Sequence, residues 1–296
     1  MLPLTLLIWI AAEIGGYLAL ARLGFGAGWG GAVLAASGGL LGLRAGINAI
    51  GWLFAANFAS PAPKLGLVGR LRLMLGEYLA FLLTFLAVLP CERLWMPADR
   101  LRPGGGPPLL LVHGYGCSRG VWWLLRRRLE AAGHAVATVS LFPQNTGIDA
   151  LVPQLQRRIE ETCAATGSPQ LILIGHSMGG LVCRAYLARH GEARAERLIT
   201  LATPHAGSEL ARFGMGRNTR EMEPASPWLR GLAAGRLAIP VFCLCNPWDN
   251  YVMPQDSQRL PGARNIDLPP AGHTAMLYDK RTAAIVLDAC LEGKKP

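Results

Sequence analysis

The stretch that most constrains the fold of this chain is residues 171–180, LILIGHSMGG. Four apolar residues run into a G-x-S-x-G motif centred on Ser177, and the residues after it, LVCRAYLARH, have helical spacing. A strand that passes through this turn into a helix is typical of a nucleophile elbow, in which the serine has strained backbone and its hydroxyl stands clear of the sheet. Gly175 and Gly179 leave room for the tight turn. The motif therefore predicts Ser177 as a nucleophile that is made reactive by its position.

Strands and helices alternate on both sides of this turn. Short apolar runs typical of buried strands occupy residues 108–112, 135–141, 197–201, 239–245 and 265–268. Helical spacing occupies residues 120–133, 148–165 and 279–292. This alternation predicts an α/β fold with a mostly parallel sheet and helices on both faces. Residues 209–236 have no clean period, and we expect a loop-and-helix insertion that covers the site as a lid.

A serine nucleophile needs a base, and several histidines are candidates. In an open parallel sheet, reactive groups lie in loops at the carboxyl ends of strands. His273 follows the last predicted strand in such a loop and is the preferred base, with His205 as its competitor. His176 adjoins the serine but is directed elsewhere by the turn, and His113 is expected to hold the shape of a glycine-rich loop.

The base needs a carboxylate that fixes its tautomer and stabilises its charged form. Asp249 comes just after the apolar run 239–245 and is the preferred residue. Asp256 in the following loop and Asp267 in the last strand are the alternatives.

Two backbone N–H groups are candidates for stabilising an oxyanion. Met178 begins the helix after the serine, where the helix dipole favours negative charge. Tyr115 follows the first strand of the α/β region, and its side chain has the simpler interpretation of lining a pocket. Two such donors are worth on the order of 3 kcal/mol each to the reaction barrier.

The N-terminal residues 2–21 form an apolar run with the single charge Glu13, about the length needed to cross a bilayer. A signal peptide is the alternative, but no Lys or Arg precedes the run and it outlasts a typical signal-peptide core. We therefore expect a retained anchor.

Two more apolar stretches follow within the first 95 residues. Residues 23–63 carry the single charge Arg44, which needs a helix end or a protein-facing position, and residues 73–89 are interrupted only by Glu77. Glycines at 38, 42 and 46 predict a smooth helix face for close helix packing, with a flexible glycine-rich segment as the alternative. Together these stretches predict two or three membrane helices, whose orientation the positive charges do not settle.

The net charge of +10 arises largely from scattered arginines. Residues 126–128, three arginines, are expected to form a solvated helix face, so we expect no nucleic-acid partner, whereas anionic lipid suits the charge. The seven cysteines include no C-x-x-C pair, and we expect no metal site.

Five motifs in the order of the chain resemble the bacterial triacylglycerol lipase and esterase family of α/β-hydrolases. They are VHGYG (112–116), GHSMGG (175–180), TLATPHAGS (200–208), WDNYV (248–252) and AGHTAMLYD (271–279). The resemblance covers about residues 107–292. It gives a domain plan with a hydrophobic membrane region at 1–95, a linker at 96–107, and an α/β-hydrolase domain at 108–296 with the lid-like insertion.

The resemblance implies Ser177 as nucleophile, His273 as base and Asp249 as the residue that orients it, in the chain order of an α/β-hydrolase triad. It also implies oxyanion donors at Tyr115 and Met178, no organic cofactor, and an ester or lipid substrate. We expect a serine carboxylic-ester hydrolase in a membrane, specifically a bacterial inner membrane. The alternatives are an acyltransferase or thioesterase with the same triad, or an inactive hydrolase-like membrane binding partner. The longer insertion and the hydrophobic N-terminus depart from the compact lipases of the family.

Overall fold

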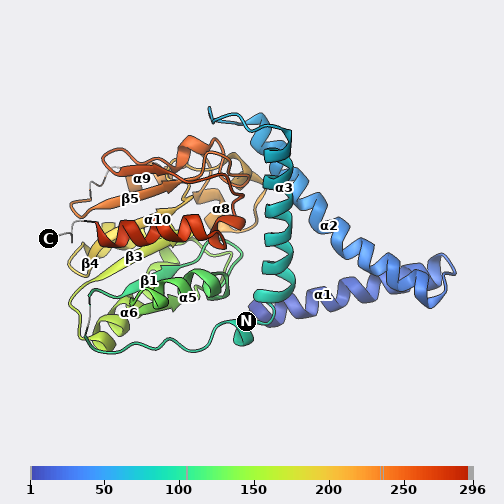
Figure 1. Ribbon diagram of the computed structural model, residues 1–296, viewed down its shortest axis with the longest axis horizontal. Helices are drawn as coiled ribbons and strands as arrows, with labels where there is room; N and C mark the ends of the chain where they lie inside the picture. The colour runs from blue at the N-terminus through green and yellow to red at the C-terminus, as the bar shows by residue number, and fades with distance from the viewer. Residues whose placement is uncertain (1, 105, 234, 236, 293–296) are drawn as a thin grey trace.

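Six strands form one sheet in the C-terminal two thirds of the chain (Figure 1). The structure is a computed structural model that describes residues 2–104, 106–233, 235 and 237–292. The strands are β1 (Leu109–Val112), β2 (Val136–Val139), β3 (Leu171–His176), β4 (Ala195–Leu201), β5 (Val241–Cys245) and β6 (Arg264–Asp267). They pair in the order β2-β1-β3-β4-β5-β6, and every pairing is parallel. The predicted parallel sheet is confirmed, and β3 with its serine turn lies near its centre.

Helices cover both faces of this sheet. The main ones are α5 (Trp123–Ala131), α6 (Ile148–Thr166), α7 (Met178–His190) and α10 (Lys280–Leu291). Successive residues of a strand face opposite sides, so Leu109 and Leu111 of β1 belong to the core with α5 and α10. Leu110 and Val112 belong to the other core, with α6 and α7. We call residues 108–292 the sheet domain.

An insertion separates β4 from β5, where the sequence predicts loops and helices. Its elements are η4 (Glu209–Phe213), α8 (Arg217–Glu221) and α9 (Pro227–Ala233). Residues 234 and 236 of this insertion lie outside the described residues, as do residues 293–296 at the end of the expected hydrolase domain.

Three long apolar helices precede the sheet domain. They are α1 (Leu2–Ala19) continued by η1 (Leu20–Gly24), α2 (Trp29–Asn57), and α3 (Leu67–Leu82) continued by η2 (Leu83–Val88), with the short α4 (Glu92–Trp95) after them. The helical stretches Leu2–Gly24, Trp29–Asn57 and Leu67–Val88 are each long and apolar enough to cross a membrane. Figure 1 shows α3 lying against the sheet domain, while α1 and α2 extend away from it. We call residues 2–95 the helical region.

The single charge of α2 lies at a helix contact, as expected. Arg44 forms an ion pair of 2.5 Å with Glu13 of α1, and both side chains are nearly buried. The prediction for the glycines is wrong, because no atom lies within 4 Å of a Cβ built at Gly38, Gly42 or Gly46. The buried face of α2 instead runs through Ala32, Ala36, Arg44, Asn48, Gly51 and Ala55, so it lies elsewhere on the helix.

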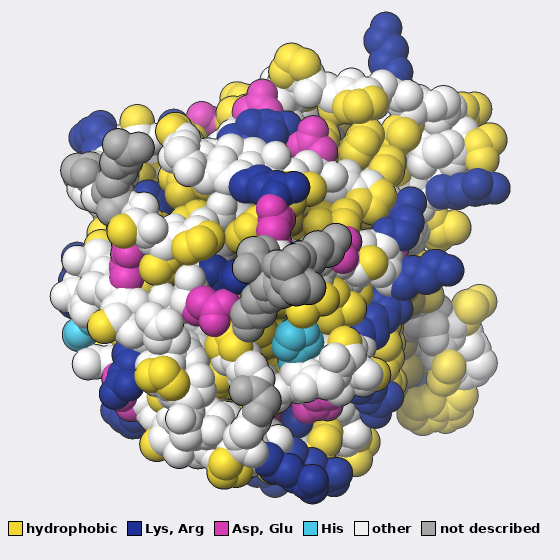
Figure 2. Space-filling model, turned by 60° about the vertical axis from the view of Figure 1, so that its left-hand side comes forward, with side chains coloured by type: hydrophobic (Ala, Val, Ile, Leu, Met, Phe, Trp, Pro, Cys, Tyr) yellow, Lys and Arg dark blue, Asp and Glu magenta, His cyan; other side chains and the backbone are white. Residues whose placement is uncertain are grey.

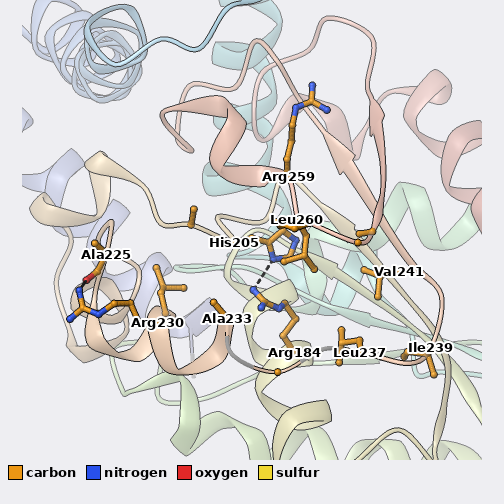
Figure 3. A pocket seen from close by; sticks show the side chains of 16 residues that line it. Arg184, His205, Ala225, Arg230, Ala233, Leu237, Ile239, Val241, Arg259 and Leu260 are labelled. Atoms are coloured by element: carbon orange, nitrogen blue, oxygen red, sulfur yellow. Dashed lines mark hydrogen bonds between the residues drawn. The ribbon is translucent and has the colours of Figure 1, made fainter.

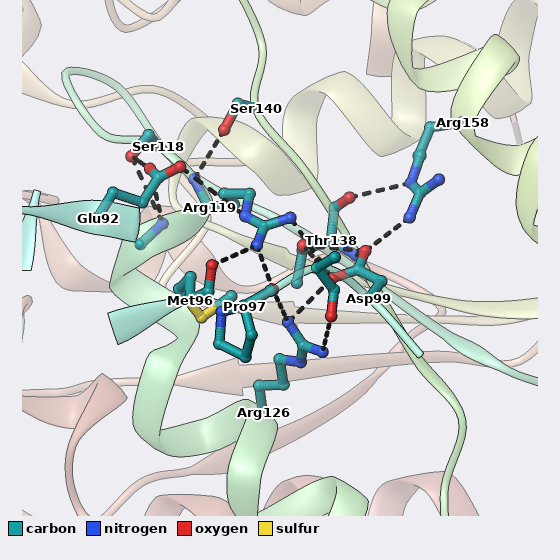
Figure 4. Close-up of polar contacts among 12 residues, drawn as sticks. Glu92, Met96, Pro97, Asp99, Ser118, Arg119, Arg126, Thr138, Ser140 and Arg158 are labelled. Carbon is teal, nitrogen blue, oxygen red and sulfur yellow. Dashed lines mark hydrogen bonds and ion pairs between the residues drawn. The ribbon is translucent and has the colours of Figure 1, made fainter. Parts of the chain in front are cut away.

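The segment expected to be a linker is fastened to the sheet domain by one buried carboxylate. Asp99 forms ion pairs with Arg126 at 3.0 Å and Arg158 at 2.6 Å, and it accepts a hydrogen bond from the backbone N–H of Thr138 at 2.7 Å (Figure 4). The expectation of a solvated face at 126–128 is wrong for Arg126, because this side chain is buried against Asp99. An isolated buried carboxylate would be costly, so the arginines and the segment stabilise each other's positions.

The outer surface of the sheet domain carries charges of both signs. Figure 2 shows acidic and basic side chains interspersed with small apolar patches on one face. Several exposed arginines are paired with acidic residues, for example Arg194 with Glu160 at 2.8 Å and Arg212 with Glu209 at 2.7 Å. Much of the positive charge is therefore balanced locally.

Candidate active site

Ser177 occupies a sharp turn between β3 and α7. Its backbone angles are φ 53° and ψ −127°, a region that a residue with a side chain rarely adopts and that costs of order 1–3 kcal/mol. The Ser177 N–H donates to the Leu201 carbonyl at 2.8 Å, which anchors the turn to β4. The strained elbow predicted from the G-x-S-x-G motif is therefore present.

The glycine at 179 is required by a close approach of backbone. A Cβ at this position would lie 2.2 Å from the Val112 carbonyl oxygen and 2.6 Å from that of His113. Since these atoms belong to the end of β1 and its loop, Gly179 lets the first turn of α7 press against the neighbouring strand. That contact brings the loop after β1 up to the serine.

His273 and Asp249 are joined by a short hydrogen bond. The distance from His273 Nδ1 to Asp249 Oδ2 is 2.7 Å, and Asp249 is fully buried at the end of β5. Asp249 Oδ1 accepts from the backbone N–H groups of Tyr251 at 2.7 Å and Val252 at 2.8 Å. These backbone contacts fix the carboxylate through Oδ1 and leave Oδ2 to face the imidazole.

The electrostatic surroundings of His273 suit a general base. Burial is the largest single influence and lowers the pKa of this histidine, but the charge and hydrogen bond of Asp249, together with the charge of Glu77, outweigh burial, so the pKa is raised above its ordinary value. The backbone N–H of His273 donates to Asn250 Oδ1 at 3.0 Å, so the loop that holds Asp249 also positions the backbone of His273.

Ser177 and His273 line one cavity of about 380 Å³, which we call the Ser177 cavity. Among the described residues, no hydrogen bond joins the Ser177 hydroxyl to the His273 ring. Such contacts are commonly long in unliganded enzymes and shorten when substrate binds. The structure thus brings Asp249 and His273 into direct contact and places Ser177 with His273 in the same cavity.

The two expected oxyanion donors flank the serine. Met178 is the first residue of α7. A Cβ at Gly114 would lie 2.9 Å from Ser177 Cβ and 3.4 Å from its hydroxyl oxygen, so Tyr115 directly follows a residue in contact with the serine. The Tyr115 hydroxyl donates to the Met215 carbonyl at 2.8 Å, which connects this loop to the insertion.

His205 and His113 take no part in the contact between His273 and Asp249. His205 is buried beside Arg184, 3.3 Å from its guanidinium, and borders a separate cavity of about 790 Å³ that does not include Ser177 (Figure 3). His113 accepts from the Leu141 N–H at 2.9 Å and bonds the Gly114 carbonyl at 2.8 Å, while burial lowers its pKa to about 4. The expected loop-holding role of His113 is confirmed.

The alternative acids are also placed away from the imidazole. Asp256 and Asp267 are exposed and form ion pairs with Arg259 at 3.1 Å and 2.6 Å.

Two residues near the base were missed by sequence reasoning. Glu77 of α3 is fully buried, and its carboxylate accepts from the N–H groups of Thr274 and Ala275. His176 does not point away from the site, because its ring centroid lies 4.5 Å from that of His273 and its Nε2 is 3.2 Å from the His273 carbonyl oxygen. The signal for Glu77 was its position as the single charge within an otherwise apolar run.

The helical region also supplies walls of the Ser177 cavity. Ile47 of α2, Phe81 of α3 and Phe85 of η2 line it together with residues of the sheet domain. No group of three or more His, Cys, Asp or Glu side chains placed to hold a metal ion occurs in the part of the chain that the structure describes.

The sheet domain has an α/β-hydrolase fold. Residues 107–225 match the family model described as the alpha/beta hydrolase fold. The mature form of the Bacillus licheniformis lipase BlEst2 superposes with a TM-score of 0.56 at 20% identity, over 67% of this chain and 96% of that one. Aspergillus fumigatus lipase B gives 0.54 at 16% identity, over 65% of this chain and 55% of that one.

Within this class, the chain is similar to triacylglycerol lipases, which confirms the resemblance predicted from the motifs. The triacylglycerol lipase of Pseudarthrobacter phenanthrenivorans is 35% identical over 114 residues, 36% of this chain and 35% of that protein. The human (lyso)-N-acylphosphatidylethanolamine lipase is 26% identical over 180 residues, 57% of this chain and 50% of that protein. The chain therefore spans about a third to a half of the length of these relatives.

Proposed function

We propose that this chain is a membrane-associated serine carboxylic-ester hydrolase that acts on apolar acyl esters. The observation that carries the proposal is the contact of 2.7 Å between His273 and a buried Asp249, together with the cavity that His273 shares with Ser177 on its strained elbow. The similarity to triacylglycerol lipases supports the same conclusion.

The reaction begins when the Ser177 hydroxyl oxygen attacks the ester carbonyl carbon and His273 Nε2 takes the hydroxyl proton. The N–H groups of Tyr115 and Met178 stabilise the oxyanion that forms. Collapse of this tetrahedral intermediate breaks the ester C–O bond, and the leaving alcohol takes the proton from His273. Water then attacks the acyl-enzyme with the same proton transfers and releases the carboxylic acid, which restores the serine.

The lining of the Ser177 cavity favours an apolar acyl group. Phe81 and Phe85 from the helical region line the cavity together with Leu210 and Met222 of the insertion, so an acyl chain would lie among hydrophobic side chains. Phe213 of the insertion also contacts Phe54 of α2, with ring centroids 4.9 Å apart. We propose that residues 209–236 act as a lid over the Ser177 cavity.

The three apolar helices support a location in a membrane, and we propose the bacterial inner membrane. Their large hydrophobic side chains are widely exposed, for example Trp9, Leu34 and Leu71. Exposed apolar surface of this extent needs lipid or a partner to cover it. In this proposal residues 1–95 form the membrane region and residues 108–296 the hydrolase domain.

The test uses membranes that contain the whole chain. The enzyme should react with a fluorophosphonate probe and hydrolyse p-nitrophenyl esters over a series of acyl lengths, and Ser177→Ala should lose both activities. Full ester hydrolysis by Ser177→Ala would refute the proposed nucleophile. Absence of both activities in the unaltered chain would favour an inactive binding partner, and ester formation with added alcohols in place of hydrolysis would favour an acyltransferase.

A further inference from the structure

A carboxylate from the helical region is buried against the loop that carries the base. Glu77 is the single charge of the apolar stretch 73–89, and it is fully buried. Its Oε2 accepts from the Ala275 N–H at 2.8 Å and from the Thr274 N–H at 3.0 Å, and its Oε1 lies 3.0 Å from the same Thr274 nitrogen. A buried carboxylate is tolerated where such donors satisfy it. The contact therefore joins α3 to the residues that directly follow His273.

The residue that precedes His273 contacts the same carboxylate. A Cβ at Gly272 would lie 2.3 Å from Glu77 Oε2, so only glycine leaves room for the carboxylate here. Glu77 therefore contacts the loop on both sides of His273. On the far side of the loop, Asn250 accepts from the His273 N–H, so the backbone of the base is held between α3 and the acid loop.

The helical region holds the acid loop as well. The Ser60 N–H donates to Gln255 Oε1 at 2.8 Å, and Gln255 Nε2 donates to the Asp249 carbonyl at 2.9 Å. At Gly51 of α2, a Cβ would lie 2.9 Å from the Asn250 carbonyl oxygen. The loop that carries His273 and the loop that carries Asp249 therefore both contact the helical region.

From these contacts we propose that Glu77 is a positioning residue for His273, so that the helical region forms part of the catalytic machinery in addition to being an anchor. This inference rests on the proposed function, in which His273 is the base. The groups that face the His273 ring are Asp249 from the acid loop, His176 from β3, Tyr251 with its ring centroid 5.4 Å away, and Glu77 from α3. Glu77 acts on this ring through the backbone it holds and through its negative charge.

Two substitutions separate these effects. Glu77→Gln retains an acceptor oxygen that can occupy the Oε2 position and bond both N–H groups, but it removes the charge and puts an NH2 group in place of Oε1, which accepts from the Thr274 N–H. Glu77→Ala removes the acceptor and the charge together and leaves two buried N–H groups without a partner. The matched control is Thr84→Val, which leaves the Glu77 carboxylate in place and breaks a different contact between the same helix and the sheet domain, the hydrogen bond of 2.6 Å to Tyr278.

The assays measure kcat, KM and the pH dependence of kcat/KM for a short p-nitrophenyl ester, using the whole chain in membranes and normalised to membrane-inserted protein. We expect Glu77→Ala to lower kcat by about 10- to 100-fold with little change in KM, because the substrate walls remain. Glu77→Gln should retain more of kcat than Glu77→Ala, because it keeps one acceptor oxygen, but it should move the rising limb of the pH profile to lower pH, because a negative charge near the imidazolium is lost. Thr84→Val should change neither quantity.

An unchanged kcat and pH profile in Glu77→Ala would overturn the inference. Equal losses in Glu77→Ala and Thr84→Val would also overturn it, since both would then reflect general loosening between helix and sheet domain. These outcomes differ from failure of the proposed function, in which the unaltered chain would be inactive or Ser177→Ala would be as active as the unaltered chain.

Discussion

Replacement of Asp249 by asparagine tests the contact between His273 and Asp249 most directly, because the structure fixes how the new amide must lie. Asp249 Oδ1 accepts from the N–H groups of Tyr251 and Val252, so this position must keep an acceptor oxygen. In Asp249→Asn the carbonyl oxygen therefore stays there, and the amide NH2 takes the place of Oδ2, 2.7 Å from His273 Nδ1. Two N–H donors cannot face each other, so Nδ1 must become the acceptor.

The imidazole proton then moves to Nε2, the nitrogen that should accept the proton of Ser177. The base is present in the wrong tautomer, and in serine hydrolases this change lowers kcat by about 10⁴-fold. The hydrogen bonds that hold the acid loop survive, so we expect kcat to fall about 10³- to 10⁴-fold, or roughly 4–5.5 kcal/mol in barrier, with little loss of folded protein. Asp267→Asn is the matched control, because this exposed carboxylate pairs only with Arg259 among the described residues.

The assay compares initial rates on p-nitrophenyl butyrate at saturating substrate for the unaltered chain, Asp249→Asn and Asp267→Asn, in membranes and at a pH where a free imidazole is neutral. A slow recovery at high pH is expected only for Asp249→Asn, where hydroxide can replace the base. If Asp249→Asn kept kcat within tenfold of the unaltered chain, the assignment of Asp249 as the residue that orients His273 would be wrong.

Three further predictions concern the base, the cavity wall and the segment at 96–107. The rate kcat/KM should rise with pH through a pKa above the ordinary 6.5 of histidine, because Asp249 favours the charged ring of His273; a rising limb well below that value in a pH–rate profile would contradict this. Phe85→Trp should narrow the Ser177 cavity and lower the ratio of palmitate to butyrate ester hydrolysis about tenfold, and an unchanged ratio would remove Phe85 from the acyl site. Asp99→Asn should remove the ion pairs with Arg126 and Arg158, leave Glu130 as the ion-pair partner of Arg126, and destabilise the sheet domain by about 2–3 kcal/mol, measured as a lower midpoint of thermal inactivation, whereas the exposed Asp149→Asn should not.

The elements that could be predicted from the sequence are those encoded by neighbouring residues. The elbow at Ser177 follows from a strand, a G-x-S-x-G turn and a helix that are consecutive in the chain, and the structure has all three. The position of Asp249 after an apolar strand is likewise a local signal, and its strand becomes β5. Parallel strands place their carboxyl ends on one edge, so local patterns were enough to bring these loops together.

Contacts between distant segments could not be predicted in the same way. Glu77 is 197 residues from Thr274, and nothing in the apolar run around it indicates which backbone it satisfies. Arg126 resembles its two arginine neighbours in sequence, but its direction on α5 points it at Asp99, which belongs to a segment without regular structure. The glycines of α2 show the same limit, because their spacing defines a helix face without saying whether that face meets another helix.

The chain changes in composition at about residue 95, but residues on both sides of that boundary form the candidate site. The first part is apolar and the second has the mixed composition of a globular domain, yet Phe85 lines the Ser177 cavity and Glu77 holds the histidine loop from the apolar side. An enzyme that needed its helices only for attachment could place them on any surface of the sheet domain. In this chain α3 lies against the edge where the strands end, and Phe81 of α3 and Phe85 of its continuation η2 line the Ser177 cavity. Under the proposed function, this one helical stretch supplies both an apolar wall for the substrate and the carboxylate that positions His273.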